Sequence, residues 1–449
     1  MIDVSLIGAV LAGVVVLIVL ILRFKIQAFI ALLIASILVG ILSGLDPMII
    51  IKTVQEGMGS TLGFVAVVVG LGAIFGAILE HSGGAESLAV FMLKKFGEKR
   101  SSWALMLTGF IVAIPVFFDV AFIILVPMIY ALQRKTGKSL LLYGIPLLAG
   151  LAITHSFIPP TPGPIAVADI LTADLGWVIM FGVLVGIPTA IVCGPLFGKY
   201  IAKQIFVEAP EVIETDSKTI NHPPVMSIIG IISVPIVLIV CNTIINSPLI
   251  AEDAVPLKVK EWVSMIGHPF TALIIANLIA WYSLGLRRGF TRSKLLDIST
   301  KSLAPAGVII LITGAGGVFK QVLVNTGTGE MLANYFADKG ISIIVFGFIA
   351  AVIIRILQGS ATVAMITAAG LTAPLISLNA SEPEKALLVI AIAAGASIMS
   401  HVNDSGFWLV GKYLRLNEKQ TFKSWTVMTI LLALTGFVTV LLISLFVST

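Results

Sequence analysis

The feature that most constrains this chain is a series of long stretches without any acidic or basic side chain. They occupy residues 4–22, 26–45, 57–79, 176–198, 223–251, 262–286 and 424–449. Each is close to the ~20 apolar residues that a helix needs to cross the hydrocarbon of a bilayer. Hydrophobic residues make up 58% of the chain and charged residues 11%, whereas soluble domains have about 25% charged residues. The sequence therefore predicts an all-α polytopic membrane protein without a separate soluble domain.

Several other classes of protein are disfavoured by the same sequence. The first apolar segment begins Met-Ile-Asp and lacks a basic start and a small-residue cleavage site, so it is expected to be a retained span and not a signal peptide. The net charge of +5 comes from Lys and Arg in short loops, where positive-inside bias places them, so no nucleic acid partner is expected. Cys193 and Cys241 both lie in apolar runs, which predicts neither a disulfide nor a metal site, and no cofactor is expected.

An internal repeat divides the chain into two related parts. Residues 70–89 align without a gap on residues 314–333, and eight of the twenty positions are identical. A Thr-His pair at 154–155 and a Ser-His pair at 400–401 recur at a similar offset. We expect one half at 1–203 and another at 225–449, joined by a polar cytoplasmic linker at 204–224.

The spacing of basic clusters predicts one re-entrant hairpin in each half. Basic clusters flank residues 101–133, and these 33 residues are too few for two crossings of ~20 residues each. They fit a hairpin that enters from the cytoplasm and bends near residues 115–119. Residues 340–381 correspond to it and bend at 358–362, entering from outside. Each half then has about five spans plus one hairpin, giving about ten spans plus two hairpins, or about 14 when hairpin limbs are counted. An odd number of spans makes the halves inverted repeats, the plan of secondary transporters.

Polar breaks within apolar sequence are the candidate binding regions, because irregular backbone in a membrane needs protein or a wet cavity around it. Four prolines and a glycine interrupt residues 159–164. From this first break the substrate-binding candidates are Thr154, His155, Ser156 and Thr161. A Pro-rich external loop is the alternative interpretation.

The second break, at residues 397–408, combines titratable and hydroxyl side chains in an apolar region. Such residues are costly in lipid and usually line a pathway or pair internally. Asn403 and Ser405 are substrate-binding candidates, and His401 and Asp404 are proton-coupling candidates, together with His155. The alternative is that His401 and Asp404 form a structural pair.

The two hairpin bends supply the remaining candidates. Asp119 stands alone in an apolar run, where burial favours the protonated form of a carboxyl group, so it is a candidate proton carrier. A helix cap is the alternative role. Arg355 precedes a Gly-Ser break and could hold a carboxylate with its planar fork, or lie at the interface with its head in water. The exposed amides at a helix start add attraction for an anion. The further binding candidates there are Gly359, Ser360, Ala361 and Thr362.

Motifs for other chemistry are missing from the sequence. It contains no Walker A pattern, no Gly-x-Ser-x-Gly elbow and no His-Glu-x-x-His zinc motif. We therefore expect a carrier driven by an ion gradient and not an enzyme.

The motifs resemble those of the gluconate permease family of proton symporters over nearly the whole chain. The matching stretches are GGAESLA at 83–89, PVFFDVAF at 115–122, THSFIPPTPGPIAVA at 154–168, GAGGVFKQVLV at 314–324, QGSATVAMITAAG at 358–370 and SHVNDSGFW at 400–408. The family pattern has Glu and His where this chain has Asp119 and Thr161. The EHSGGAESLA pattern at 80–89 and the FFDV pattern at 117–120 look closer to those of uncharacterised sugar-acid members of the family.

The resemblance implies import of gluconate or a related hydroxycarboxylate with protons across the bacterial cytoplasmic (inner) membrane. It also implies an elevator-like motion and a homodimer. Three functional alternatives stay open: a carrier for D-serine or another small carboxylate, which the resemblance implies, a sodium-coupled carrier, and a passive anion channel.

Overall fold

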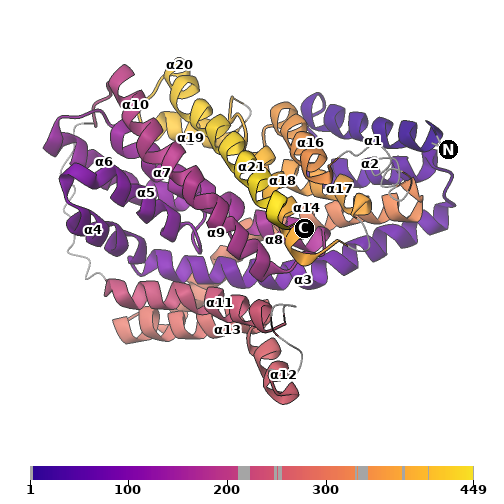
Figure 1. Ribbon diagram of the computed structural model, residues 1–449, viewed down its shortest axis with the longest axis horizontal. Coiled ribbons are helices and arrows are strands. Elements are labelled where there is room, and N and C mark those ends of the chain that lie inside the picture. Colours follow the sequence, from indigo (N-terminus) through magenta and orange to yellow (C-terminus); the bar gives the residue numbers. More distant parts are fainter. Residues whose placement is uncertain are drawn as a thin grey trace.

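The computed structural model describes residues 4–210, 223–246, 250, 255–328, 331, 342–376, 380–402 and 404–447. All regular structure within these residues is helical (Figure 1). The helices of the first half are α1 (Val4–Leu22), α2 (Ala28–Leu42), α3 (Pro47–His81), α4 (Gly84–Phe96), α5 (Ser101–Val112), α6 (Phe118–Thr136), α7 (Leu141–Phe157), α8 (Pro162–Ile170), α9 (Leu175–Ile191) and α10 (Phe197–Gln204). Those of the second half are α11 (Val225–Asn246), α12 (Leu257–Ile266), α13 (Pro269–Ala280), α14 (Arg292–Asn325), α16 (Ile343–Gln358), α17 (Ala361–Thr372), α18 (Glu382–Ser397), α19 (Ser405–Tyr413), α20 (Glu418–Thr421) and α21 (Val427–Val447).

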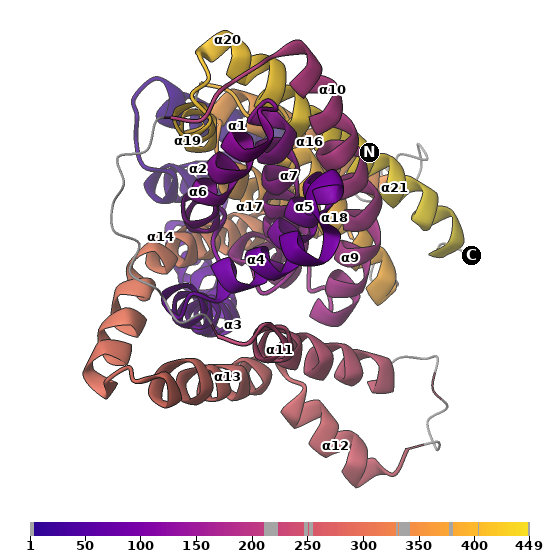
Figure 2. The same ribbon diagram turned by 90° about the vertical axis from the view of Figure 1, so that its left-hand side faces the viewer.

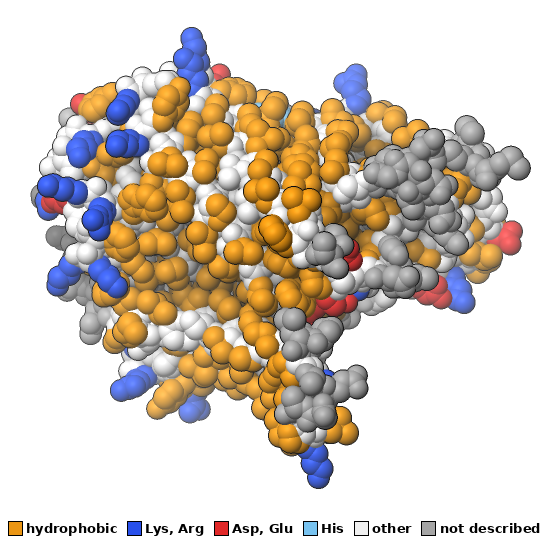
Figure 3. Space-filling model, in the orientation of Figure 1, with side chains coloured by type: hydrophobic (Ala, Val, Ile, Leu, Met, Phe, Trp, Pro, Cys, Tyr) orange, Lys and Arg blue, Asp and Glu red, His pale blue; other side chains and the backbone are white. Residues whose placement is uncertain are grey.

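The apolar character of these helices confirms the predicted membrane class. Among the described residues, seven helical segments are long and apolar enough to cross a bilayer, and shorter apolar helices accompany them. Hydrophobic side chains cover most of the face shown in Figure 3, and Lys and Arg gather along its left margin, where α4, α6 and α10 lie in Figure 1. An ion pair between Lys135 and Glu98 and a hydrogen bond of 3.1 Å from Arg134 Nη2 to the carbonyl oxygen of Pro210 join the basic loops at this margin.

The two longest helices, α3 and α14, pack against each other along their lengths. Small residues make this close approach possible, since a Cβ on Gly57 would lie 2.7 Å from Cα of Val318, and one on Gly317 would lie 2.1 Å from Oγ1 of Thr61. Helices α11 and α13 lie on one side of α3, and the bundle that contains α5 to α10 and α16 to α21 lies on the other (Figures 1 and 2).

Short breaks interrupt the helices at four places, in the same order in both halves. Residues 113–117 separate α5 from α6, and residues 158–161 separate α7 from α8. In the second half, residues 359–360 separate α16 from α17, and residues 398–404 separate α18 from α19. The predicted bends at 115–119 and 358–362 therefore overlap observed helix breaks. Of the predicted linker, residues 211–222 lie outside the described residues, as do residues 340, 341 and 377–379 of the second predicted hairpin.

Helices α7 and α18 form the centre of the bundle, and nearly all their side chains are buried. Helix α7 crosses α5 at a contact between glycines. A Cβ on Gly150 would lie 2.2 Å from the carbonyl oxygen of Met106, and one on Gly109 would lie 2.4 Å from that of Leu147. Any side chain at these positions would force the two backbones apart.

We predict that Gly150→Ala lowers the melting temperature of the purified protein, because overpacking a close contact costs about 1–3 kcal/mol. Gly230→Ala in α11 is the matched control, since nothing lies within 4 Å of a Cβ there. Thermal unfolding in detergent measures both. Equal melting temperatures for the two variants would contradict the observed crossing.

Candidate functional site

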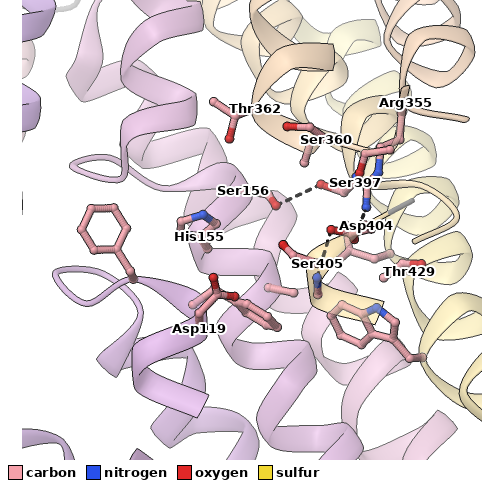
Figure 4. Close-up of a pocket in the computed structure, with 18 of the residues that line it drawn as sticks. Asp119, His155, Ser156, Arg355, Ser360, Thr362, Ser397, Asp404, Ser405 and Thr429 are labelled. Atoms are coloured by element: carbon pink, nitrogen blue, oxygen red, sulfur yellow. Dashed lines mark hydrogen bonds and ion pairs between the residues drawn. The ribbon is translucent and has the colours of Figure 1, made fainter. Parts of the chain in front are cut away.

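A cavity of about 570 Å³ lies where three of the helix breaks meet (Figure 4). The start of α6, the α16–α17 turn and the start of α19 face into it. Helices α7, α14 and α21 complete its walls. Its polar lining consists of Asp119, His155, Ser156, Arg355, Ser360, Thr362, Ser397, Asp404, Ser405 and Thr429. Residues far apart in the sequence thus surround one polar space within an apolar protein.

An ion pair between Arg355 and Asp404 connects two of the breaks. The distance from Arg355 Nη2 to Asp404 Oδ2 is 2.6 Å, and Arg355 is only 3% exposed. Arg355 also donates from Nη1 to the carbonyl oxygen of Gly359 and from Nε to that of Ile398, the latter at 3.3 Å. The guanidinium group therefore holds the end of α16 against the end of α18. Because Arg355 is buried, the interfacial interpretation of this residue is wrong.

Asp404 is the N-cap residue of α19 and has further partners besides Arg355. Its Oδ1 accepts a hydrogen bond of 3.1 Å from the backbone N–H of Gly406, which caps the helix, and Oδ2 accepts one from the Ser400 hydroxyl. The ion-pair partner of Asp404 is Arg355, so the alternative interpretation, in which the side chains of His401 and Asp404 form a structural pair, is not observed. His401 Nε2 lies instead 2.9 Å from the carbonyl oxygen of Ile356, and His401 does not line the cavity.

Side chains from the start of the last helix satisfy the unwound backbone at residue 400. A π-helical turn, Phe422–Thr426, leads into α21. Trp425 Nε1 donates to the Ser400 hydroxyl at 2.6 Å, and Thr426 Oγ1 donates to the Ser400 carbonyl oxygen at 2.5 Å. Thr429 Oγ1 accepts from the Ser400 N–H at 3.0 Å. These hydrogen bonds give the N–H and C=O groups of a broken helix the partners that water would provide outside the membrane.

Two helix N-termini face the cavity beside the ion pair. Gly359 has a φ of +89°, which ends α16 in the left-handed region and lets the chain start α17 at once. Ser360 caps α17 by accepting from the Val363 N–H at 3.4 Å, and α19 begins at Ser405. Free N–H groups and the helix dipole favour negative charge at such ends.

The opposite wall carries Asp119, His155 and Ser156. Asp119 is exposed toward the cavity at the second position of α6, and the N-cap residue is Phe117, so Asp119 is neither buried nor the helix cap. Ser397 Oγ donates to Ser156 Oγ at 2.9 Å, which links the two walls. His155 Nδ1 is buried and has no hydrogen-bond partner within the described part of the chain.

The other predicted binding residues lie outside this cavity. Thr154 Oγ1 donates to the carbonyl oxygen of Phe110 at 2.8 Å, and Thr161 Oγ1 donates to that of Ile158 at 2.7 Å. The Thr154 hydroxyl therefore bonds to the backbone of α5, and the Thr161 hydroxyl bonds to the backbone of the α7–α8 break. Residues 158–168 are buried throughout, so the alternative of an external Pro-rich loop is wrong. Asn403 lies outside the described residues.

Several cavity residues were not among the sequence candidates. Ser397, Trp425 and Thr429 belong to helices whose sequences read as ordinary apolar spans, and Pro305 and Ile309 lie within α14. Ser397 is the first residue of the predicted second break, residues 397–408, but it was not among the candidates chosen from that break. As for metal binding, the described residues contain no group of three or more His, Cys, Asp or Glu side chains that could hold an ion.

The fold and the cavity are those of a helical, multi-pass membrane protein, and the proteins that it matches are permeases and transporters, one of them an inner membrane permease, and not enzymes. The chain belongs to the GntP permease family, whose model matches residues 4–446. It is 42% identical to a gluconate permease of Pseudomonas aeruginosa, over 96% of this chain and 95% of that protein. It is 37% identical to the Gnt-II system L-idonate transporter of Escherichia coli, over 96% of this chain and 98% of that protein. The family predicted from the sequence motifs is thereby confirmed.

Two solved structures share the fold at low sequence identity. The YdaH transporter of Alcanivorax borkumensis superposes with a TM-score of 0.64 at 13% identity, covering 88% of this chain and 89% of that one. MtrF of Neisseria gonorrhoeae superposes with a TM-score of 0.62 at 15% identity, covering 87% and 83%. Both likenesses support the transporter fold.

We predict that Asp404→Asn destabilises the protein by about 3–5 kcal/mol, because it leaves Arg355 buried without a counter-charge. The double variant Arg355→Gln/Asp404→Asn should recover part of this loss. Thermal unfolding in detergent gives both values. Glu56→Gln is the control, because it breaks an exposed pair with Lys52 that contributes at most about 1 kcal/mol. A loss for Asp404→Asn as small as for Glu56→Gln would contradict the assigned pairing.

Proposed function

We propose that the protein imports a small hydroxycarboxylate, gluconate or a related sugar acid, together with protons across the cytoplasmic membrane. The observation that carries this proposal is a polar cavity in which the permanent cation, Arg355, is already paired with Asp404. The names of the relatives support the substrate class.

The charge of the cavity supports the coupling to protons. Arg355 and Asp404 cancel, so an ionised Asp119 leaves the cavity with net negative charge before any substrate arrives. A substrate carboxylate near the helix starts at Ser360 and Ser405 is then opposed by Asp119. Protonation of Asp119 removes this repulsion, so binding of the anion and uptake of a proton favour each other.

The hydroxyl lining supports a polyhydroxylated substrate. Six hydroxyl side chains face the cavity, namely Ser156, Ser360, Thr362, Ser397, Ser405 and Thr429. Each hydroxyl can both donate and accept a hydrogen bond, as can each hydroxyl of a sugar acid. A site built to pair with hydroxyl groups discriminates against analogues that lack them, because its polar groups would be left unpaired.

The proposal includes the architecture expected of a secondary transporter. The halves are inverted repeats, the α5–α6 and α16–α17 pairs are re-entrant hairpins, and transport proceeds by an elevator-like motion. The shared order of breaks in the two halves supports this plan. The homodimer stays a prediction that the mass of the purified protein in detergent checks.

Counterflow in proteoliposomes tests the function. We expect vesicles preloaded with gluconate to accumulate labelled gluconate transiently, with unlabelled L-idonate competing, while acetate and D-serine compete weakly because they lack the polyhydroxy chain. An inward proton gradient should drive net accumulation. Absence of gluconate counterflow would contradict the proposed substrate, and accumulation that follows a sodium gradient alone would contradict proton coupling.

We predict that Asp119→Asn abolishes accumulation driven by a pH gradient while gluconate exchange continues, because the amide cannot carry the proton but keeps the shape of the side chain. Uptake and exchange of labelled gluconate in the same vesicles separate the two activities. Asp174→Asn is a control carboxylate outside the cavity, where it caps α9. Full pH-driven accumulation by Asp119→Asn would remove Asp119 from the coupling mechanism.

A further inference from the structure

A second cavity, of about 240 Å³, adjoins the central one. It lies between the last turns of α3, the start of α6 and the first part of α14. Phe117, Val120 and Pro305 line both cavities and so form the partition between them. Phe117 also lines a small third space beside the α7–α8 break. One aromatic side chain therefore lies where all three spaces meet.

Both cavities lie along one face of α14. Lys294, Ile298, Lys301 and Pro305 line the second cavity, and Pro305 and Ile309 line the central one. Spacings of three and four residues put these side chains on a single helical stripe. Fifteen residues at ~1.5 Å each give a track of about 22 Å from the central cavity to the beginning of α14.

The far wall of the second cavity is held close to the α5–α6 turn. A Cβ on Gly76 of α3 would lie 1.9 Å from the carbonyl oxygen of Pro115, so the backbones touch there. Arg288 Nη1 donates to the Ser82 carbonyl oxygen at 2.9 Å, which ties the end of α3 to the segment before α14. The second cavity is thus bounded by packed elements on both sides.

Charge at the mouth of this cavity favours an anion. On the lining of the cavity, Lys294 and Lys301 are balanced by Asp297 and Glu80, and the excess of positive charge comes from Arg287, Arg288 and Arg292 in the segment that leads into α14. Lys301 pairs with Asp297 at 3.0 Å. Lys294 lines the cavity, is exposed and forms no ion pair with any described residue. The mouth therefore carries an excess of positive charge with one lysine available for a ligand.

We propose that the second cavity is an anion-binding vestibule, in which Lys294 holds the carboxylate substrate before or after it passes the partition at Phe117. This proposal rests on the proposed function for the identity of the anion. The vestibule is distinct from the central site, because its cations are exposed lysines and not a buried arginine. Its role is to concentrate the anion at one end of the transport route.

Thiol labelling tests the vestibule in the full-length protein in proteoliposomes. Cys193→Ala and Cys241→Ser remove the native thiols, and Ser302→Cys places one in the second cavity. We expect a negatively charged methanethiosulfonate reagent to react faster than a positively charged one. Lys294→Gln should lower the ratio of the two rates about threefold at low ionic strength, the effect of removing one charge about 12 Å away in water. Gluconate should slow the labelling, and glucose, which has no carboxylate, should not.

Matched variants make the labelling decisive. Thr300→Cys lies on the opposite face of α14 and does not line the cavity, so its labelling should be unaffected by gluconate. Ala77→Cys on the α3 wall repeats the measurement if Ser302→Cys does not fold. Equal rates for the two reagents, or no protection by gluconate at either cavity position, would overturn the vestibule.

The outcomes separate this proposal from the proposed function. The ratio of labelling rates requires no transport, so it tests the charge of the vestibule on its own. Active gluconate counterflow with equal labelling rates would overturn the vestibule and leave the proposed function standing. A charge-dependent ratio in a protein without gluconate counterflow would overturn the substrate while keeping an anion vestibule.

Discussion

The ion pair between Arg355 and Asp404 is the interaction on which the central cavity depends. It joins the end of α16 to the start of α19, two broken helices that would otherwise leave backbone groups without partners inside a membrane. Hydrogen bonds from Arg355 to carbonyl oxygens at both breaks, and from the last helix to Ser400, complete the arrangement. A buried pair of this kind adds little net stability over an apolar contact, but losing one partner is costly. The pair therefore fixes geometry more than it stabilises the fold.

The same pair determines what the cavity can bind. Because Asp404 already balances Arg355, the cavity offers an anion only dipoles, hydroxyls and the groups that can take up a proton. Two helix starts provide the dipoles, and Asp119 stands across the cavity from them. In such a site, binding of the anion and protonation of Asp119 are linked. Protonation removes the repulsion that the anion would meet, and the bound anion in turn makes protonation of Asp119 more favourable. Coupling of substrate binding to proton binding then needs no second site outside the cavity.

Much of this organisation could be predicted from the sequence because the signals are local. Uncharged runs predicted membrane helices, and residues 115–119 and 358–362 predicted breaks through prolines and a Gly-Ser pair. Asp119, His155, Ser156, Ser360, Thr362, Asp404 and Ser405 all line the observed cavity. The partner of Asp404 could not be predicted, because Arg355 meets it only through the packing of α16 against α18. Thr161 was predicted to bind substrate, but its hydroxyl donates a hydrogen bond to the carbonyl oxygen of Ile158 and does not face the cavity.

The central claim is that the cavity takes up a sugar acid and a proton together. The most direct measurement is isothermal titration of the purified protein with gluconate in two buffers of different ionisation enthalpy, which counts the protons bound per ligand. The account predicts proton uptake that rises toward one proton per gluconate at pH values where Asp119 is ionised before gluconate binds. Binding of gluconate with the same heat in both buffers would mean that no proton is taken up and would contradict it.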